Sequence, residues 1–254
     1  MKAIVLAAGY ATRLYPLTLD TPKPLLRVGG RPMLEHVLER LAPVEAIDEV
    51  YVVTNAKFAP HFRAWAEGFS PPRAGLRLTV VDDGTTDDET KLGAIGDIGL
   101  VLEREAVDAD LVVVAGDNLF SENLTGFGAE AARRAAPVVA VYDVGDLSQM
   151  HKYNSLTLDG EGRITFFEEK PDRPTSTLTA IALYFYPRTS LPLIRRYLGE
   201  GNNPDQPGRL VQWLYPQTAV YTWTVPGRWY DIGSRETLEE ADAEFGGPPS
   251  GAVV

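Results

Sequence analysis

The chain has 254 residues, enough for one or two domains and a large buried core. Its 24 basic and 35 acidic residues give a net charge of −11, which disfavours nucleic acid or an anionic membrane surface as the main partner. The absence of cysteine excludes disulfides, thiolate nucleophiles and cysteine-based zinc sites. With only three histidines, any metal is expected to be a hard cation held by carboxylates.

The N-terminal apolar segment, residues 3–8, stops at Gly9. It is too short for the core of a signal peptide or for a membrane span. We therefore expect a soluble cytoplasmic protein that has no membrane partner.

Strand and helix patterns alternate through the first half of the chain. Short apolar, β-branched runs predict buried strands at 3–8, 50–54, 78–81, 111–115 and 138–141. Apolar residues at three- and four-residue spacing predict helices between them, at 33–41, 58–67, 92–105 and 124–135. This order predicts a doubly wound α/β fold, with a mostly parallel sheet and helices on both faces.

The pattern changes after about residue 145. Three closely spaced strands are predicted at 155–158, 164–168 and 180–186, and they indicate a small antiparallel insert. Helices at 191–197 and 236–245, with a strand at 220–225, complete the chain. We expect one domain over 1–245, made of a first part (1–145) and a substrate-facing part (146–234). The Gly- and Pro-containing tail, 246–254, is expected to be flexible.

Open α/β sheets bind ligands beyond the carboxyl ends of their strands, so the residues after each strand are the candidate site. The first strand is followed by a small-residue turn at Gly9, then by Arg13 and Lys23. Backbone N–H groups in such a turn can approach phosphate oxygens, and the two cations supply local positive charge. The segment is neither a Walker loop nor a dinucleotide fingerprint, and an ordinary turn with surface basic residues is the alternative.

Carboxylates follow two other strand-like runs. Asp117 comes directly after the apolar run 111–115, and Asp231 lies between a strand-like run and a helix. Both are placed to hold Mg²⁺ against substrate phosphates, and a turn or cap role is the alternative for each. Glu169 and Lys170 stand side by side after another strand, where they can serve sugar hydroxyls and a phosphate, or simply be solvated surface charges.

Taken together, these segments resemble the sugar-1-phosphate nucleotidyltransferases, most closely the bacterial branch that includes glucose-1-phosphate thymidylyltransferase. The resemblance rests on LAAGYATRLYPLTLDTPKPLL at 6–26, AGDNLF at 115–120, FEEKP at 167–171, IALYFYP at 181–187 and WYDIG at 229–233. It covers nearly the whole chain in order. It implies a Rossmann-like nucleotidyltransferase fold and transfer of a nucleotidyl group from a nucleoside triphosphate to a sugar 1-phosphate. The favoured substrates are glucose 1-phosphate with dTTP or UTP, and CTP is a possible third nucleotide.

The resemblance implies roles for individual residues. Arg13, Lys23 and Lys170 would be catalytic, and Asp117 and Asp231 would hold Mg²⁺. The nucleotide would contact Leu6, Ala8, Gly9, Ala11, Thr12, Gly84, Thr85 and Lys91. The sugar phosphate would contact Asn118, Tyr153, Asn154, Glu169, Lys170 and Tyr184. A homo-oligomer is one expectation, because the family commonly assembles.

Two departures from the family pattern affect the nucleotide side. Ala8 and Ala11 replace glycines of the family's GGxGTR loop, and Ala11 would be strained if it had to adopt a positive φ. The segment 82–97 lacks the glutamine that contacts the base in thymidylyltransferases. The base therefore stays open, as does the choice between this enzyme and a nucleotide-sugar-dependent glycosyltransferase or a catalytically silent nucleotide-sugar sensor.

Overall fold

The computed structural model describes residues 1–246. Its strands are β1 (Lys2–Leu6), β2 (Arg27–Val28), β3 (Arg31–Pro32), β4 (Glu49–Thr54), β5 (Arg77–Asp82), β6 (Leu111–Ala115), β7 (Asn118–Phe120), β8 (Val138–Asp143), β9 (Asn154–Leu158), β10 (Ile164–Glu169), β11 (Leu178–Tyr186), β12 (Tyr221–Thr224) and β13 (Trp229–Asp231). Its α-helices are α1 (Met33–Leu41), α2 (Ala59–Gly68), α3 (Ala94–Arg104), α4 (Thr125–Arg133), α5 (Leu191–Gly199), α6 (Pro207–Leu214) and α7 (Arg235–Phe245). Short 3₁₀ turns lie at Thr12–Leu14, Lys23–Leu25, Leu147–Lys152 and Arg188–Ser190.

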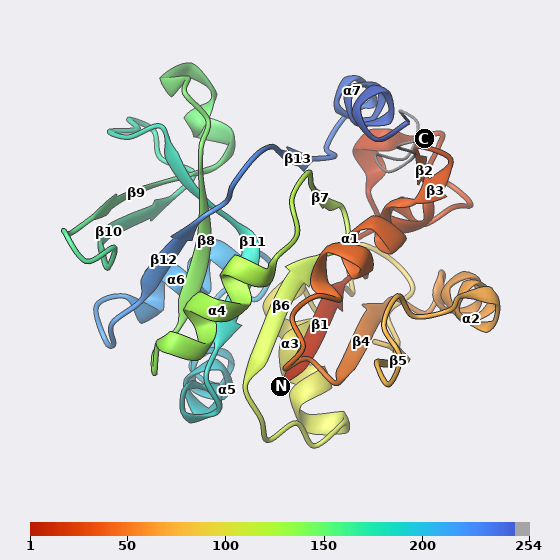
Figure 1. The fold of residues 1–254 in the computed structure, drawn as a ribbon, viewed down its shortest axis with the longest axis horizontal. Coiled ribbons are helices and arrows are strands. Elements are labelled where there is room, and N and C mark those ends of the chain that lie inside the picture. Colours follow the sequence, from red (N-terminus) through yellow and green to blue (C-terminus); the bar gives the residue numbers. More distant parts are fainter. Residues whose placement is uncertain (247–254) are drawn as a thin grey trace, which may run out of the picture.

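A seven-stranded sheet in the order β12-β8-β11-β6-β1-β4-β5 forms the centre of the molecule (Figure 1). The β1–β4, β1–β6, β4–β5 and β8–β12 pairs are parallel, as the alternating sequence pattern predicts. Helices α1 and α4 contribute to the core on one face, and α3, α5 and α6 contribute to the core on the other. The predicted doubly wound, mostly parallel α/β fold is confirmed.

One predicted strand has a different place from the one expected. The run 180–186 was assigned to the antiparallel insert, but β11 lies within the central sheet, antiparallel to both β6 and β8. Almost every residue of β11 is buried, and its side chains contribute to the cores on both faces of the sheet. A two-stranded insert could not cover both faces of such a strand, so the sheet has to accommodate it.

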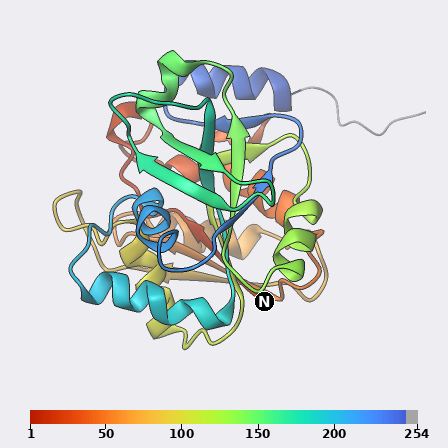
Figure 2. The same ribbon diagram turned by 90° about the vertical axis from the view of Figure 1, so that its left-hand side faces the viewer.

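The insert itself is the β9–β10 hairpin, which projects from the β11–β8–β12 side of the molecule (Figures 1 and 2). Asn154 fastens it to the sheet: its Oδ1 accepts from the backbone N–H of Ala180 at 2.7 Å, and its Nδ2 donates to the Ala180 carbonyl at 2.9 Å. The hairpin therefore has a fixed position beside the start of β11.

The C-terminal helix α7 returns to the N-terminal half and packs against β2 (Figure 1). The backbone N–H of Gly29 donates to the Asp242 carboxylate at 2.8 Å, and a Cβ at Gly29 would overlap the Phe245 backbone. Gly29 also has φ +58°, so both its conformation and its close contact require glycine. Apart from Gly246, the tail that the sequence predicts to be flexible lies outside the described residues.

Element boundaries follow the sequence closely where apolar runs are buried. The predictions 33–41 and 111–115 coincide with α1 and β6, whereas β1 stops at Leu6 and α4 at Arg133, each two residues before the predicted end. None of the helices within residues 1–246 combines the length and apolarity needed to cross a membrane.

Candidate active site

A cleft of about 580 Å³ runs along the carboxyl ends of the central strands, from the end of β5 to β11 and the end of β10. It lies where an open α/β sheet is expected to bind its ligand. The predicted site residues that line it are Leu6, Ala8, Gly9, Ala11, Thr12, Arg13, Lys23, Lys91, Asp117, Asn118, Tyr153, Asn154, Glu169, Tyr184 and Asp231. Segments as far apart in the chain as Leu6 and Asp231 thus meet at one site.

The loop after β1 forms the middle of the cleft. Ala11 has φ 49° and ψ 43°, the left-handed conformation that was expected to strain an alanine. Side chains hold this loop in place: Thr18 Oγ1 donates to the Ala11 carbonyl at 2.8 Å, and Asn55 Nδ2 donates to the Ala8 carbonyl at 2.8 Å. Gly9 has open space where a Cβ would stand, which leaves room for a ligand against the backbone.

Lys23 and Asp117 form an ion pair at the centre of the cleft, with Nζ 2.5 Å from Oδ2. Only 12% of the Lys23 side chain is exposed, so this cation is held against the floor of the cleft. Asn118 positions the carboxylate: its Nδ2 donates to Asp117 Oδ1 at 3.0 Å, while its Oδ1 accepts from Trp229 Nε1 at 2.8 Å. The amide of Asn118 is thus engaged with protein groups, which indicates a positioning role.

Asp231 ends β13, which pairs with β7 in the register that sets Asp231 opposite Asn118. Burial, and after it the negative charge of Asp117, raises the pKa of Asp231 to about 6. The charges of Lys23 and Arg13 oppose this rise in pKa. The two carboxylates are therefore close enough to repel each other, and a cation between them would relieve that repulsion.

Two carboxylates suit Mg²⁺, which proteins commonly hold by one or two carboxylates together with substrate phosphates and water. No cluster of three or more His, Cys, Asp or Glu side chains suited to a metal occurs among residues 1–246. The donor set fits a metal that is completed by its substrate rather than one held in a closed protein cage.

The β10–β11 end of the cleft combines a carboxylate with aromatic rings. Glu169 Oε2 is buried without a hydrogen-bond partner among the described residues, and burial raises the pKa of this carboxyl. Tyr184 is 4% exposed and stacks on Tyr186, with ring centroids 6.2 Å apart. Tyr153 packs edge-on against Trp229. An acceptor beside apolar ring faces is typical of a pocket for a polyhydroxylated ring.

Helix α6 closes this end of the cleft against Glu169. A Cβ at Gly208, in the first turn of the helix, would overlap Glu169 Oε2, so a glycine is needed for this close approach. The backbone N–H of Glu169 donates to Gln212 Oε1 at 3.1 Å, which further ties the end of β10 to the helix.

Three predicted site residues do not line the cleft. Lys170 is exposed and has φ 51°, and its backbone N–H donates to the Tyr153 carbonyl at 2.9 Å. Gly84 is exposed as well. Thr85 is buried behind the cleft wall, where its Oγ1 contacts the Tyr10 hydroxyl at 3.2 Å. Lys91 does line the cleft, but its Nζ pairs with Asp88 at 3.2 Å and Asp205 at 3.4 Å.

Sequence reasoning missed several cleft residues. They include Tyr10, Asp83, Asp97, Lys152, Gln206, Gly208 and Trp229. Asp97 could not be found from the sequence, because an acid in the first turn of a helix is favourable in solvent and only packing buries this one. For Gln206 and Gly208 no signal was available, because only tertiary packing brings α6 to the cleft.

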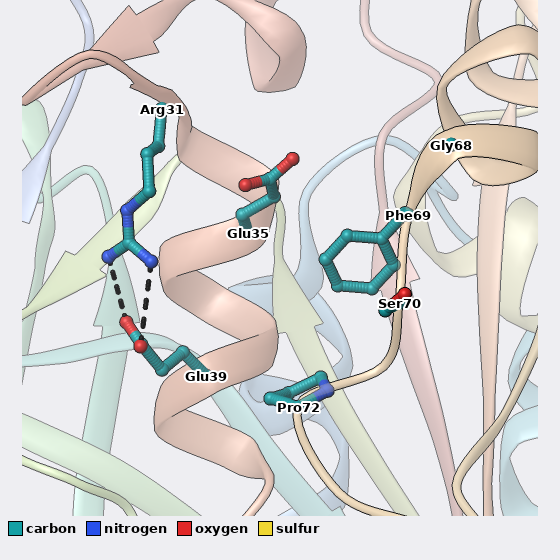
Figure 3. Close-up of a pocket in the computed structure, with 7 residues that line it drawn as sticks. All are labelled: Arg31, Glu35, Glu39, Gly68, Phe69, Ser70 and Pro72. Carbon is teal, nitrogen blue, oxygen red and sulfur yellow. Dashed lines mark hydrogen bonds and ion pairs between the residues drawn. The ribbon is translucent and has the colours of Figure 1, made fainter.

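Two other features lie away from this chemistry. The Asp108-Ala109-Asp110 segment precedes β6, at the opposite end of the sheet, where Asp108 forms a bidentate pair with Arg188 at 2.6 Å. It is a polar turn on the far side of the sheet from the cleft. A second hollow of about 360 Å³ lies between α1 and the segment after α2, and its Arg31 is paired with Glu39 at 2.9 Å (Figure 3).

The sequence and the fold match those of known proteins. The model of the family described as "Nucleotidyl transferase" matches residues 2–246. The chain belongs to this family. UTP–glucose-1-phosphate uridylyltransferase AglF of Haloferax volcanii is 28% identical over 186 residues, covering 73% of this chain and 72% of that protein. Glucose-1-phosphate thymidylyltransferase of Streptomyces antibioticus is 26% identical over 246 residues, covering 95% of this chain and 65% of that protein.

Other nucleotidyl transferase relatives are longer than this chain. The bifunctional protein GlmU of Methanocaldococcus jannaschii is 24% identical over 245 residues, which are 95% of this chain but 53% of GlmU. The chain thus spans about half the length of that relative. Among solved structures, UDP-glucose pyrophosphorylase complexed with UDP-glucose matches with a TM-score of 0.79 at 22% identity, covering 96% of this chain and 97% of the other. This likeness shows the shared fold.

Proposed function

We propose that the chain transfers a nucleotidyl group from a nucleoside triphosphate to a sugar 1-phosphate, giving a nucleotide sugar and pyrophosphate. The observation that carries this proposal is the centre of the cleft. Arg13 and Lys23 bring positive charge beside Asp117 and Asp231, between a phosphate-sized loop and a polyol-type pocket. The names of the uridylyl- and thymidylyltransferase relatives support the same reaction class.

In this reaction an oxygen of the sugar phosphate attacks the α-phosphorus. A new P–O bond forms as the bond between the α-phosphorus and the bridging oxygen breaks, and the electron pair leaves with pyrophosphate. A phosphate monoester has a second pKa of about 6, so the nucleophile is mostly ionised at neutral pH and no general base is needed. The main barrier is repulsion between the two anions, and positioning with positive charge lowers it.

Different residues of the cleft bind different parts of the two substrates. Arg13, which is exposed at the loop after β1, faces the phosphates that leave, and Lys23 neutralises the α-phosphate and the incoming phosphate. Glu169 accepts hydrogen bonds from sugar hydroxyls against the Tyr184 ring. Lys170 serves the sugar phosphate only when its exposed side chain turns toward the cleft, because its backbone holds it at the rim.

Asp117 and Asp231 would hold Mg²⁺, with Asn118 keeping Asp117 in orientation. When bound, this metal would supply positive charge to the phosphate oxygens around the α-phosphorus. Lys23 already faces Asp117, so the protein provides part of that charge itself.

We propose that residues 1–145 bind mainly the nucleotide and that residues 146–234 bind mainly the sugar phosphate, within one domain over 1–245. We also propose a cytoplasmic location, because nucleoside triphosphates and sugar phosphates are cytoplasmic metabolites. Assembly into a homo-oligomer stays a prediction, and sedimentation velocity of the purified chain tests it.

The test is pyrophosphate release with Mg²⁺ across the nucleoside triphosphates, each paired with a panel of hexose 1-phosphates. Release that requires both substrates supports the transferase. Hydrolysis of the nucleoside triphosphate without a sugar phosphate contradicts it. So does the absence of pyrophosphate release with every pair of substrates when the nucleotide is shown to bind. Lys23→Ala is the matched inactive variant and Arg188→Ala is the control, because Arg188 lies at the opposite end of the sheet.

A further inference from the structure

Two carboxyl groups form the wall of the cleft at its β5 end. Asp83 directly follows β5, and Asp97 stands in the first turn of α3. Asp97 is only 5% exposed, and its carboxyl lies close to that of Asp83. Burial, together with the nearby charge of Asp83, raises the pKa of Asp97 to about 8. This raised pKa favours the protonated form of Asp97 at neutral pH, and the acid O–H can then donate to the Asp83 carboxylate.

The polar atoms of Asp83 and Asp97 that remain available to a ligand are hydrogen-bond acceptors. Asp83 Oδ1 accepts from the Thr85 backbone N–H at 2.7 Å and from Thr85 Oγ1 at 2.8 Å. Asp97 Oδ1 is buried and has no hydrogen-bond partner among the described residues. A protonated carboxyl that donates through one oxygen keeps the other as an acceptor. A buried acceptor without a donor is destabilising, so a ligand that donates at this point gains affinity.

The position of the wall assigns it to one part of the nucleotide. In the sheet order β5-β4-β1-β6-β11, the loop after β1 lies between the wall and the sugar pocket beside β11. With the triphosphate at the loop after β1 and the sugar at Glu169, the nucleoside extends toward β5. The base is then the part of the substrate that reaches Asp83 and Asp97.

We propose that Asp83 and Asp97 recognise the base and select one that carries an exocyclic amino group. This inference rests on the proposed nucleotidyl transfer. The amino group of cytosine or adenine donates hydrogen bonds to a carboxyl oxygen, which is how carboxylates read cytosine N4 in nucleic acids. A uracil or thymine base presents a carbonyl oxygen at the same place, facing the oxygen of Asp97 with no proton between them. Of the nucleotides that the sequence admits, CTP carries this amino group, whereas UTP and dTTP do not.

Two matched pairs of nucleotides isolate the amino group. CTP differs from UTP, and ATP from ITP, by an exocyclic amino group in place of a carbonyl oxygen and by the associated ring nitrogen. Binding of each to the purified chain with Mg²⁺ is measured by isothermal titration calorimetry, which needs no acceptor. We expect Kd for CTP to be at least tenfold below Kd for UTP, and ATP to bind better than ITP if purines bind. Equal or tighter binding of UTP relative to CTP overturns the inference, and so does the failure of both CTP and ATP to bind.

Calorimetry and the pyrophosphate-release assay together distinguish a failure of base recognition from a failure of nucleotidyl transfer. Preferential binding of CTP without pyrophosphate release for any acceptor counts against the transferase and leaves base recognition standing. Pyrophosphate release with UTP as efficient as with CTP overturns base recognition and leaves the transferase standing.

Variants test whether these carboxyls cause the preference. Asp97→Asn keeps a donor toward Asp83 and a free oxygen, so it should keep the CTP preference. Asp97→Leu removes both and should bring CTP and UTP within threefold of each other, with circular dichroism used to check its fold. Asp82→Asn is the control, because Asp82 is the chain neighbour of Asp83 but pairs with Arg63 and does not line the cleft. Loss of the preference in Asp82→Asn, or its retention in folded Asp97→Leu, overturns the inference.

Discussion

Asp97→Asn is expected to stabilise the fold, and the gain should grow with pH. In the folded protein Asp97 has a pKa of about 8, whereas the ordinary value is 3.8. Between these two values the unfolded chain loses the proton while the folded chain retains it. The folded state then binds more protons, so the stability contributed by Asp97 falls as pH rises from about 4 to about 8 and levels off above that.

The magnitude follows from the difference in pKa. At pH 7 the unfolded carboxyl lies about three pH units above its own pKa, and each unit corresponds to about 1.4 kcal/mol, so the penalty reaches up to about 4 kcal/mol. At pH 5 the same reasoning gives about 2 kcal/mol. Asparagine has no ionised form, and its amide N–H can replace the acid O–H that donates to Asp83.

Urea unfolding at pH 5 and pH 7 measures this effect. The free energy of unfolding of Asp97→Asn should exceed that of the wild type by more at pH 7 than at pH 5. Asp20→Asn is the control for loss of one negative charge, since Asp20 is exposed and its change should stay within about 0.5 kcal/mol. A gain that is the same at both pH values, or a loss of stability at pH 7, would refute the assignment of a protonated Asp97.

Three substitutions test the rest of the cleft. Lys23→Ala should lower kcat of pyrophosphate release by about 10²-fold or more, because it removes the buried cation at the reacting phosphates, and a rate near that of the wild type would contradict its role. Gly208→Ala should raise KM for the sugar phosphate about tenfold without changing Kd for the nucleotide, since the new Cβ displaces Glu169; an effect on nucleotide binding alone would contradict this. Lys170→Gly and Lys170→Ala should lose the same amount of activity, because both remove the ammonium group. Higher activity in Lys170→Gly than in Lys170→Ala would show instead that the left-handed backbone at this position is what matters.

Strands β1, β4 and β6 could be predicted from sequence because each is buried on both faces and reads as an apolar run. The same property led to the wrong prediction that β11 belongs to the antiparallel insert. Its nine residues look like any buried strand, and nothing in them says whether the partner is the preceding hairpin or a strand some 70 residues earlier. Strand type is encoded locally, whereas the choice of partner depends on which sheet can bury both faces.

The candidate site was predictable where charge follows a strand, as at Asp117, because the carboxyl ends of parallel strands meet at one edge. It was not predictable at Lys170, whose left-handed backbone directs the side chain to the rim, nor at Asp97, which lies inside a helical pattern. A residue within a helix has no fixed relation to the sheet edge until the packing of that helix is known. Among the missed residues this explains Asp97 and Gly208, which lie on α-helices, whereas Tyr10, Lys152 and Gln206 lie in loops and turns whose course is also set by packing.

The distribution of charge along the cleft gives a reason for an acidic chain to bind a polyanion. Arg13 and Lys23 stand in the middle, while Glu169 lies at one end and the Asp83–Asp97 pair at the other. Phosphates are repelled from both ends and attracted to the centre, whereas hydroxyl and amino groups, which donate hydrogen bonds, suit the ends. A substrate with phosphates in its middle and donors at its extremities thus fits in one position. The product of joining a nucleoside triphosphate to a sugar 1-phosphate, a base and a sugar linked through a diphosphate, has this order of groups.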